Sequence, residues 1–246
     1  MSFQLPSKQV QFFVTAPAPC PYLPDRDEVK LFTYLNKTDG SALNDQLSQL
    51  GFRRAQNIAY RPACLSCDAC KSSRVLVQRF CPSASMRRVL RTNVDLVRSI
   101  NPPIADGEHY ALICKYLTSR HKDGGMENIE ESGFAELIEE TCLTTELVDY
   151  RNNDGELIAS VLIDQLTNGP SMVYSFFRPD MSKRSLGNFM ILDHIERAKL
   201  AGKDYLYLGF WIGQSPKMNY KQRYQPLEIL QGKKWKILGE TTNEQT

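Results

Sequence analysis

The spacing of hydrophobic residues in the first hundred positions predicts a mixture of short strands and helices. Alternating hydrophobic and polar residues predict three strands, over residues 9–15, 30–36 and 73–80. Leucines at helical spacing predict a short helix that Ser41 caps and Gly51 ends. A longer helix is expected from Ser83 or Ser85 to Ile100, because its apolar residues recur on one face until a pair of prolines follows.

The second half of the chain predicts an antiparallel meander followed by a strand, a helix and a strand. Asp106 begins a helix. Hairpin patterns then predict three strands, over residues 145–151, 156–166 and 171–178. A helix with an apolar face at Ile191 and Ile195 leads into a last strand over residues 205–212. This order is the layout of the GNAT acyltransferase fold. We therefore expect an α+β protein with a GNAT-like mixed sheet and flanking helices.

A candidate domain boundary follows the second predicted helix, at Asn101-Pro102-Pro103. The chain has 246 residues, which is enough for one or two domains at roughly 150 residues each. Residues 1–103 are expected to form a smaller, basic α+β region that contains cysteines. Residues 104–246 are expected to form the GNAT-like domain.

Composition excludes several classes of protein. Hydrophobic residues make up 42% of the chain and charged residues 24%, so a largely disordered chain is not expected. The formal net charge is only +2, which excludes a uniformly basic binder. The chain contains no run of about 18 apolar residues, so no membrane helix is expected. The first residues also lack the apolar run of a signal peptide. We expect a cytoplasmic protein whose seven cysteines stay reduced.

Basic residues gather in two blocks of this nearly neutral chain. Residues 51–98 contain ten Lys or Arg and two Asp, and residues 215–236 contain six Lys or Arg and one Glu. Such blocks are typical of a face that binds a polyanion. A solvated surface whose charges are balanced in three dimensions explains them equally well.

Four cysteines form a candidate metal site. Cys64, Cys67 and Cys70 follow the spacing C-x2-C-x2-C, and Cys20 stands between two prolines nearer the start. Four thiolates can hold a zinc ion or an iron–sulfur cluster. The alternative is a set of reduced, partly buried thiols. The other three cysteines are expected to be ordinary core or surface residues: Cys81, Cys114 and Cys142.

A segment dense in aromatic and basic residues follows the last predicted strand. Its candidate RNA-binding residues are Lys217, Tyr220, Lys221, Arg223 and Tyr224. Cations pair with phosphates and tyrosine rings stack on unpaired bases, so this segment suits the single-stranded end of an RNA. The alternative is an amphipathic edge with exposed lysines and buried tyrosines.

A second candidate tRNA-binding site lies where a strand leads into a helix. Its residues are Arg184, Ser185 and Gly187, at the start of a helix whose first N–H groups can bind an anion. A comparable loop holds pyrophosphate in acyl-CoA transferases, although Asn188 is not followed here by a small residue. The alternative is a capped helix with no ligand.

Six segments match one family in the same order. They are residues 12–24, 51–64, 85–89, 120–124, 184–187 and 217–224. The chain resembles the bacterial aspartate/glutamate leucyltransferases, a branch of the arginyl-tRNA–protein transferase family. The resemblance implies a GNAT-like transferase that moves an amino acid from an aminoacyl-tRNA to a protein N-terminus.

For the bacterial branch, the resemblance implies leucyl-tRNA as donor and proteins beginning with Asp or Glu as acceptors, which are thereby marked for N-degron proteolysis. Neither ATP nor CoA is expected, because the aminoacyl ester is already activated. Two alternatives stay open: an acyl-CoA-dependent GNAT acyltransferase, and a non-enzymatic, zinc-stapled RNA-binding module.

No convincing catalytic side chain stands out in the sequence. Candidate oxyanion donors are backbone N–H groups near the ends of two strands that are expected to diverge: Phe176, Phe177, Gly209 and Trp211. The three histidines are expected to be mainly structural: His109, His121 and His194. An acidic acceptor side chain needs a cation, for which Arg87 and Arg88 are the candidates.

Overall fold

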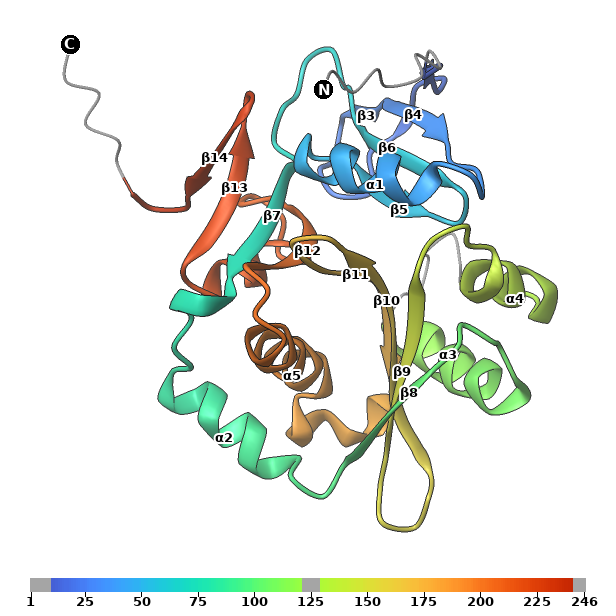
Figure 1. Cartoon of the computed structure of the whole chain (residues 1–246), viewed down its shortest axis with the longest axis vertical. Helices are drawn as coiled ribbons and strands as arrows, with labels where there is room; N and C mark the ends of the chain where they lie inside the picture. Colours follow the sequence, from blue (N-terminus) through green and yellow to red (C-terminus); the bar gives the residue numbers. More distant parts are fainter. Residues whose placement is uncertain (1–9, 121–128, 241–246) are drawn as a thin grey trace, which may run out of the picture.

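The computed structural model describes residues 10–120 and 129–240. An eight-stranded sheet with helices on both faces forms the larger part of the molecule, and a four-stranded sheet packs beside it (Figure 1). The order of the large sheet is β14-β13-β7-β12-β11-β10-β9-β8. The expected α+β fold with a mixed sheet and flanking helices is confirmed.

The large sheet contains the meander and the strand–helix–strand unit that the sequence predicts. Its strands are β7 (Lys71–Leu76), β8 (Val97–Asn101), β9 (Thr145–Arg151), β10 (Leu157–Leu166), β11 (Gly169–Phe177), β12 (Tyr205–Trp211), β13 (Leu227–Gln231) and β14 (Lys234–Ile237). Strands β9, β10 and β11 are antiparallel neighbours, whereas β11 and β12 are parallel. The helix α5 (Leu186–Leu200) connects these two parallel strands, as the GNAT-like layout requires.

Two pairs of helices cover the two faces of this sheet. Helices α2 (Ala84–Thr92) and α5 lie on one face, and helices α3 (Gly107–Arg120) and α4 (Glu131–Glu139) lie on the other (Figure 1). Neighbouring residues of β9 point to opposite faces, so Leu147 packs among α3 and α4 while Val148 packs against α5. Both side chains are fully buried. Burial of apolar surface on both faces holds the sheet between its helices.

The small sheet is held to the large one by a buried ion pair. Its strands are β1 (Phe13–Val14), β4 (Lys30–Tyr34), β6 (Ile58–Pro62) and β5 (Arg53–Ala55), in that order, and a two-stranded ribbon of β2 (Ala18–Pro19) and β3 (Asp27–Glu28) lies nearby. Helix α1 (Gly40–Gln49) begins one residue before the predicted cap. The Arg54 guanidinium donates to both carboxylate oxygens of Asp164 in β10, at 2.6 and 2.8 Å.

The predicted helix from Ser83 to Ile100 is correct at its start and wrong at its end. Ser83 caps α2, and its hydroxyl accepts a hydrogen bond from the Met86 N–H. The helix ends before Asn93, whose side-chain amide donates to two backbone carbonyls. Residues 97–101 instead form β8, because pairing satisfies the backbone groups along the edge of β9.

The predicted division after residue 103 does not coincide with the division between the two sheets. Strands β7 and β8 precede that position, yet both are hydrogen-bonded within the large sheet. The strand-forming residues of the first hundred positions therefore contribute to both sheets. Within the described parts of the chain, no helix has the length and apolar character needed to cross a membrane.

Candidate functional site

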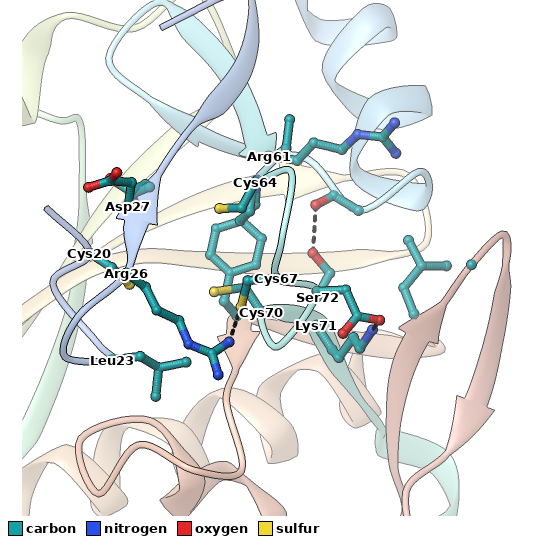
Figure 2. Close-up of a pocket in the computed structure, with 18 of the residues that line it drawn as sticks. Cys20, Leu23, Arg26, Asp27, Arg61, Cys64, Cys67, Cys70, Lys71 and Ser72 are labelled. Atoms are coloured by element: carbon teal, nitrogen blue, oxygen red, sulfur yellow. Dashed lines mark hydrogen bonds and ion pairs between the residues drawn. The ribbon is translucent and has the colours of Figure 1, made fainter. Parts of the chain in front are cut away.

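The four cysteines of the candidate metal site line one cavity. Its volume is about 290 Å³, and it lies where the ribbon β2–β3 and the loop between β6 and β7 face each other (Figure 2). Cys20 follows β2, whereas Cys64, Cys67 and Cys70 come from the loop before β7. The fold therefore brings together thiols that lie more than forty positions apart in the chain.

The electrostatics of this cavity favour the thiol form of Cys70. Burial, and then the neighbouring Cys20, Cys64 and Cys67, raise the pKa of Cys70 to about 12. The Arg26 guanidinium donates to the Cys67 Sγ at 2.9 Å. Sulfur donors in this number suit zinc or an iron–sulfur cluster. Within the described residues, however, no three His, Cys, Asp or Glu side chains are arranged to hold a metal ion, so the metal stays a prediction.

Beside this cavity, the two parallel strands of the large sheet diverge. Strands β11 and β12 share a single register pair, Ser171 with Tyr207. The pairing of β12 with β7 shifts register just before Gly209, whose φ is +74°. Positive φ is a conformation that glycine adopts without strain. The expected divergence of the two strands is thus present, while the oxyanion role of Phe176, Phe177, Gly209 and Trp211 stays a prediction.

Arg53 occupies the gap between these strands. Its Nη2 donates to the carbonyl oxygens of Met172 and Val173 in β11, at 3.1 and 3.4 Å. Its guanidinium also lies so close to β12 that a Cβ on Gly209 would fall 2.0 Å from Nη1. Arg53 is not among the residues that the sequence predicts for the site. The signal was the Arg53-Arg54 pair on a short strand, because successive side chains point to opposite sides and cannot share one role.

Lys221 lies buried next to Arg53. Its ammonium donates to the Phe210 carbonyl, and its side chain lies 5.6 Å from the centre of the Tyr220 ring. Burial, and then the charge of Arg53, lower the pKa of Lys221 well below its usual range. A buried ammonium does not meet a phosphate at the surface. The predicted tRNA contact of Lys221 is therefore not supported, because its amine is used inside the fold.

The remaining residues of the predicted RNA-binding segment divide by exposure. Arg223 is exposed at the end of η3 (Asn219–Arg223), Lys217 is exposed two residues before η3 begins, and Tyr220 is half-buried. Tyr224 is 1% exposed, and its hydroxyl donates to Asn188 at 2.7 Å. Tyr224 therefore packs in the core and does not offer its ring to a base.

The predicted anion site before α5 is closed by an internal network. The Arg184 guanidinium donates to the carboxylate of Asp95 and to the Asn93 side chain. Ser185 has a left-handed backbone conformation, with φ at +51°, and Gly187 packs against the Phe177 ring. An arginine already paired with a carboxylate has little charge left for a phosphate. This placement does not favour the acyl-CoA alternative.

The two arginines predicted to bind the acceptor lie on the outer face of α2. Arg87 and Arg88 are both exposed, and Arg87 donates to the Pro82 carbonyl at 2.6 Å. An exposed guanidinium keeps its water, and an ion pair formed there contributes about 1 kcal/mol or less. Their position does not support selective binding of a single acidic side chain.

Two of the three histidines have structural places. His109 is 4% exposed and contacts Asp106 and Asp149 through its two ring nitrogens. His194 is fully buried in α5, where burial lowers its pKa to about 3. Both lie away from the cysteine cavity, as expected for histidines with no catalytic role. His121 and the turn that follows it lie outside the described residues.

Two family models match the chain in sequence order. The one described as "Arginine-tRNA-protein transferase, N terminus" matches residues 18–88 and includes the cysteine loop and Arg53. The one described as "Arginine-tRNA-protein transferase, C terminus" matches residues 108–231 and includes β9 to β12. The second model thus covers both strands that flank the gap, and the first covers Arg53, which fills it.

The chain is also similar to individual proteins. It is 45% identical to the "Aspartate/glutamate leucyltransferase" of Phenylobacterium zucineum over 243 residues, which cover 97% of this chain and 95% of the relative. It is 48% identical to the protein of the same name from Azorhizobium caulinodans, over 94% of this chain and 96% of that one. Among solved structures, L-PGS from Bacillus licheniformis matches with a TM-score of 0.46 and 12% identity, over 74% of this chain and 52% of that chain.

Proposed function

The chain belongs to the arginine-tRNA–protein transferase family, and from this premise we infer that it transfers leucine from leucyl-tRNA to the N-terminal α-amine of proteins that begin with Asp or Glu. The observation that carries this conclusion is 45% to 48% identity, over nearly the whole length of both chains, to aspartate/glutamate leucyltransferases. The new N-terminal leucine marks the acceptor for N-degron proteolysis.

The reaction needs positioning more than chemical activation. The acceptor α-amine attacks the ester carbonyl of leucyl-tRNA, the new amide bond forms, and the bond to the tRNA hydroxyl breaks. One proton of the amine is transferred to the leaving ribose oxygen, either directly or through water, so that the tRNA leaves with a free hydroxyl. An α-amine with a pKa near 8 has a usable neutral fraction at about pH 7. Holding both substrates in place and stabilising the tetrahedral oxyanion would supply most of the rate, without ATP or CoA.

On the tRNA side, we propose that Lys217 and Arg223 bind phosphates near the aminoacylated end and that the half-buried Tyr220 ring contacts a base. Exposure of both cations supports this assignment, as does their place in and just before η3, in the segment that follows β12. We place the reaction in the cytoplasm, where charged tRNA and reduced thiols occur together.

At the cavity, we propose that Cys20, Cys64, Cys67 and Cys70 hold zinc or an iron–sulfur cluster. A bound cation would favour their thiolates and join the ribbon β2–β3 to the loop before β7. Anaerobically purified protein is expected to contain one of these metals, measured by elemental analysis, and the Cys70→Ser variant is expected to lose it. Metal-free, folded wild-type protein would overturn this assignment.

A transfer assay tests the function as a whole. Labelled leucyl-tRNA or arginyl-tRNA is mixed with the protein and with a peptide that begins with Asp or Ala. Leucine is expected on the Asp peptide alone. Transfer of arginine would reassign the donor. Absence of label from both donors on both peptides, with folded protein, would overturn the proposed function, and acetyl-CoA turnover in parallel would then support the acyl-CoA alternative.

A further inference from the structure

We propose that Arg53 is the residue that selects the acceptor, by binding the acidic side chain of its N-terminal Asp or Glu. This inference rests on the proposed function and identifies the group that recognises the acceptor. Three observations support it: an arginine without a carboxylate partner, a guanidinium held in a defined position, and a location beside the segment expected to receive the tRNA end.

Arg53 has no carboxylate partner among the described residues. Its hydrogen bonds go to two backbone carbonyls through Nη2. Four other arginines with small exposed fractions are paired with an acid: Arg54 with Asp164, Arg74 with Glu228, Arg184 with Asp95 and Arg197 with Glu146. Arg61 is also half-buried without an acidic partner in the described parts of the chain, but its guanidinium donates to the Leu50 carbonyl and lies over the Phe52 ring. A half-buried cation without a counter-ion is costly to keep unless something else binds it. An acidic ligand would supply the missing charge.

The guanidinium of Arg53 is held before any ligand arrives. Carbonyls of β11 bind one end, and the bare backbone at Gly209 leaves room for its face. The Phe210 ring lies 5.7 Å from its central carbon. Among the residues that the structure describes, Nε and Nη1 find no acceptor. A carboxylate could accept charge-assisted hydrogen bonds from these two donors. Because the Arg53 side chain is already held in place, binding would cost little of its conformational entropy.

Two tyrosine side chains, Tyr22 and Tyr220, lie within electrostatic range of the Arg53 guanidinium. Burial raises the pKa of Tyr220, and the Arg53 charge opposes that rise. Neither hydroxyl donates to an acceptor in the described part of the protein. Both can add an O–H donor to a carboxylate that binds at Arg53.

This location also suits the reaction. Tyr220 and Lys221 belong to the segment that carries the proposed tRNA contacts, and the nearby Arg53 charge acts to lower the pKa of both. In Asp and Glu, only a few bonds separate the side-chain carboxylate from the α-amine. A carboxylate held at Arg53 would therefore place the nucleophile beside the segment that receives the aminoacyl end. Exposed Arg87 and Arg88 offer no comparable enclosure.

The test compares acceptor selectivity in three proteins, the wild type, Arg53→Gln and Arg53→Lys. Matched peptides begin with Asp, Glu, Asn or Ala, and leucyl-tRNA is the donor. In Arg53→Gln, KM for the Asp and Glu peptides should rise by about 30-fold or more, as expected for losing charge-assisted hydrogen bonds, while the Asn peptide changes little. Arg53→Lys keeps the charge, so it should retain preference for Asp over Asn with a raised KM.

The control is Arg98→Gln, which removes an ion-paired arginine at the far edge of the sheet and should leave selectivity unchanged. Binding of leucyl-tRNA and the melting temperature verify that each variant is folded. If Arg53→Gln does not fold, Arg53→Lys decides: a raised KM for the Asp and Glu peptides with an unchanged KM for the Asn peptide is expected, and wild-type KM values for all peptides would overturn the proposal. Folded Arg53→Gln with the wild-type ratio of Asp to Asn transfer would also overturn it. A wild type that transfers leucine to no peptide would overturn the proposed function itself.

Discussion

Buried polar groups are matched at the junction of β8, β9 and α3, whereas those around Arg53 beside the cysteine cavity are not. Where β8, β9 and α3 meet, the Asp149 carboxylate is 2% exposed and accepts from Ser160 at 2.7 Å and Asn101 at 2.9 Å. The His109 ring lies 3.0 Å from the same carboxylate. Each buried donor in this group has a partner of opposite charge or polarity, which is what a stable core requires.

The end of the sheet beside the cysteine cavity is different. Arg53 and Lys221 rest on backbone carbonyls, and the described residues supply neither with a carboxylate. The thiol of Cys70 is held protonated by burial and by the thiols around it. Groups left unmatched in this way are typical of sites where a ligand completes the set. The residues at the first location hold the fold, and those at the second are the ones that we propose to bind a substrate or a metal.

The largest effect is expected from breaking a matched pair. Arg54→Met would leave the Asp164 carboxylate buried without its cation, although Thr145 would still donate to it. We expect a loss of about 3–5 kcal/mol in the free energy of unfolding, measured with denaturant. The partly exposed pair Arg98–Asp193 is the control, and Arg98→Met should cost about 1 kcal/mol or less. Equal losses in both variants would contradict the assignment.

A smaller loss of stability, with a large loss of selectivity, is expected for Gly209→Ala. The new Cβ would collide with the Arg53 guanidinium and would sit at a φ of +74°. We expect destabilisation of about 1–3 kcal/mol together with reduced preference for Asp peptides. Gly202→Ala isolates the backbone strain, because that glycine has φ +67° and no neighbour within 4 Å. Selectivity lost equally in both variants would show that Arg53 is not displaced.

The contacts of His109 with Asp149 and Asp106 predict that the free energy of unfolding depends on pH. Burial lowers the pKa of His109, but Asp149 and Asp106 raise it by more, so the net shift is upward. A raised pKa stabilises the fold below the unfolded value of about 6.5, and this contribution is lost as the pH rises through the folded pKa. Urea unfolding of the wild type should show this loss, and His109→Gln should not. Parallel pH profiles above pH 6.5 would sink the prediction.

The smallest effects are expected at the exposed cations. Lys217→Ala and Arg223→Ala should each weaken leucyl-tRNA binding without altering the choice between Asp and Asn peptides. If each side chain binds one phosphate, the salt dependence of tRNA affinity should fall by about one unit of slope per substitution. Filter binding at several salt concentrations measures this slope. An unchanged slope in both variants would remove η3 from the tRNA interface.

Local signals in the sequence predicted much of the fold. The Ser83 cap, the helix start at Asp106 and the hairpin of β9 and β10 are all present, because each depends on neighbouring residues. The prediction that the helix capped by Ser83 continues to Ile100 was wrong for a different reason. Apolar residues such as Val97 and Ile100 fit the spacing of a helix, and only the open edge of β9 decides for a strand.

The candidate site, too, could be predicted from the sequence only in part. The spacing of Cys64, Cys67 and Cys70 identified the loop, and the fold placed Cys20 on the same cavity. Lys221 and Arg223 look alike in the sequence, yet one is buried and the other exposed. The sequence gives no sign that Arg184 is paired, whereas in the fold its guanidinium forms an ion pair with Asp95. Burial and ion pairing depend on residues distant in the chain, so no local pattern reports them.

The sequence by itself determined the family, the reaction class and most local elements, because these depend on motifs and on short-range capping, turns and periodicity. The tertiary structure alone decided which charges are matched. Arg53 and Arg54 are adjacent, but the alternation of a strand sends one to Asp164 and the other to the gap at Gly209. The identity of a side chain sets what it can bind, and the packing of distant segments decides whether the protein itself has already bound it.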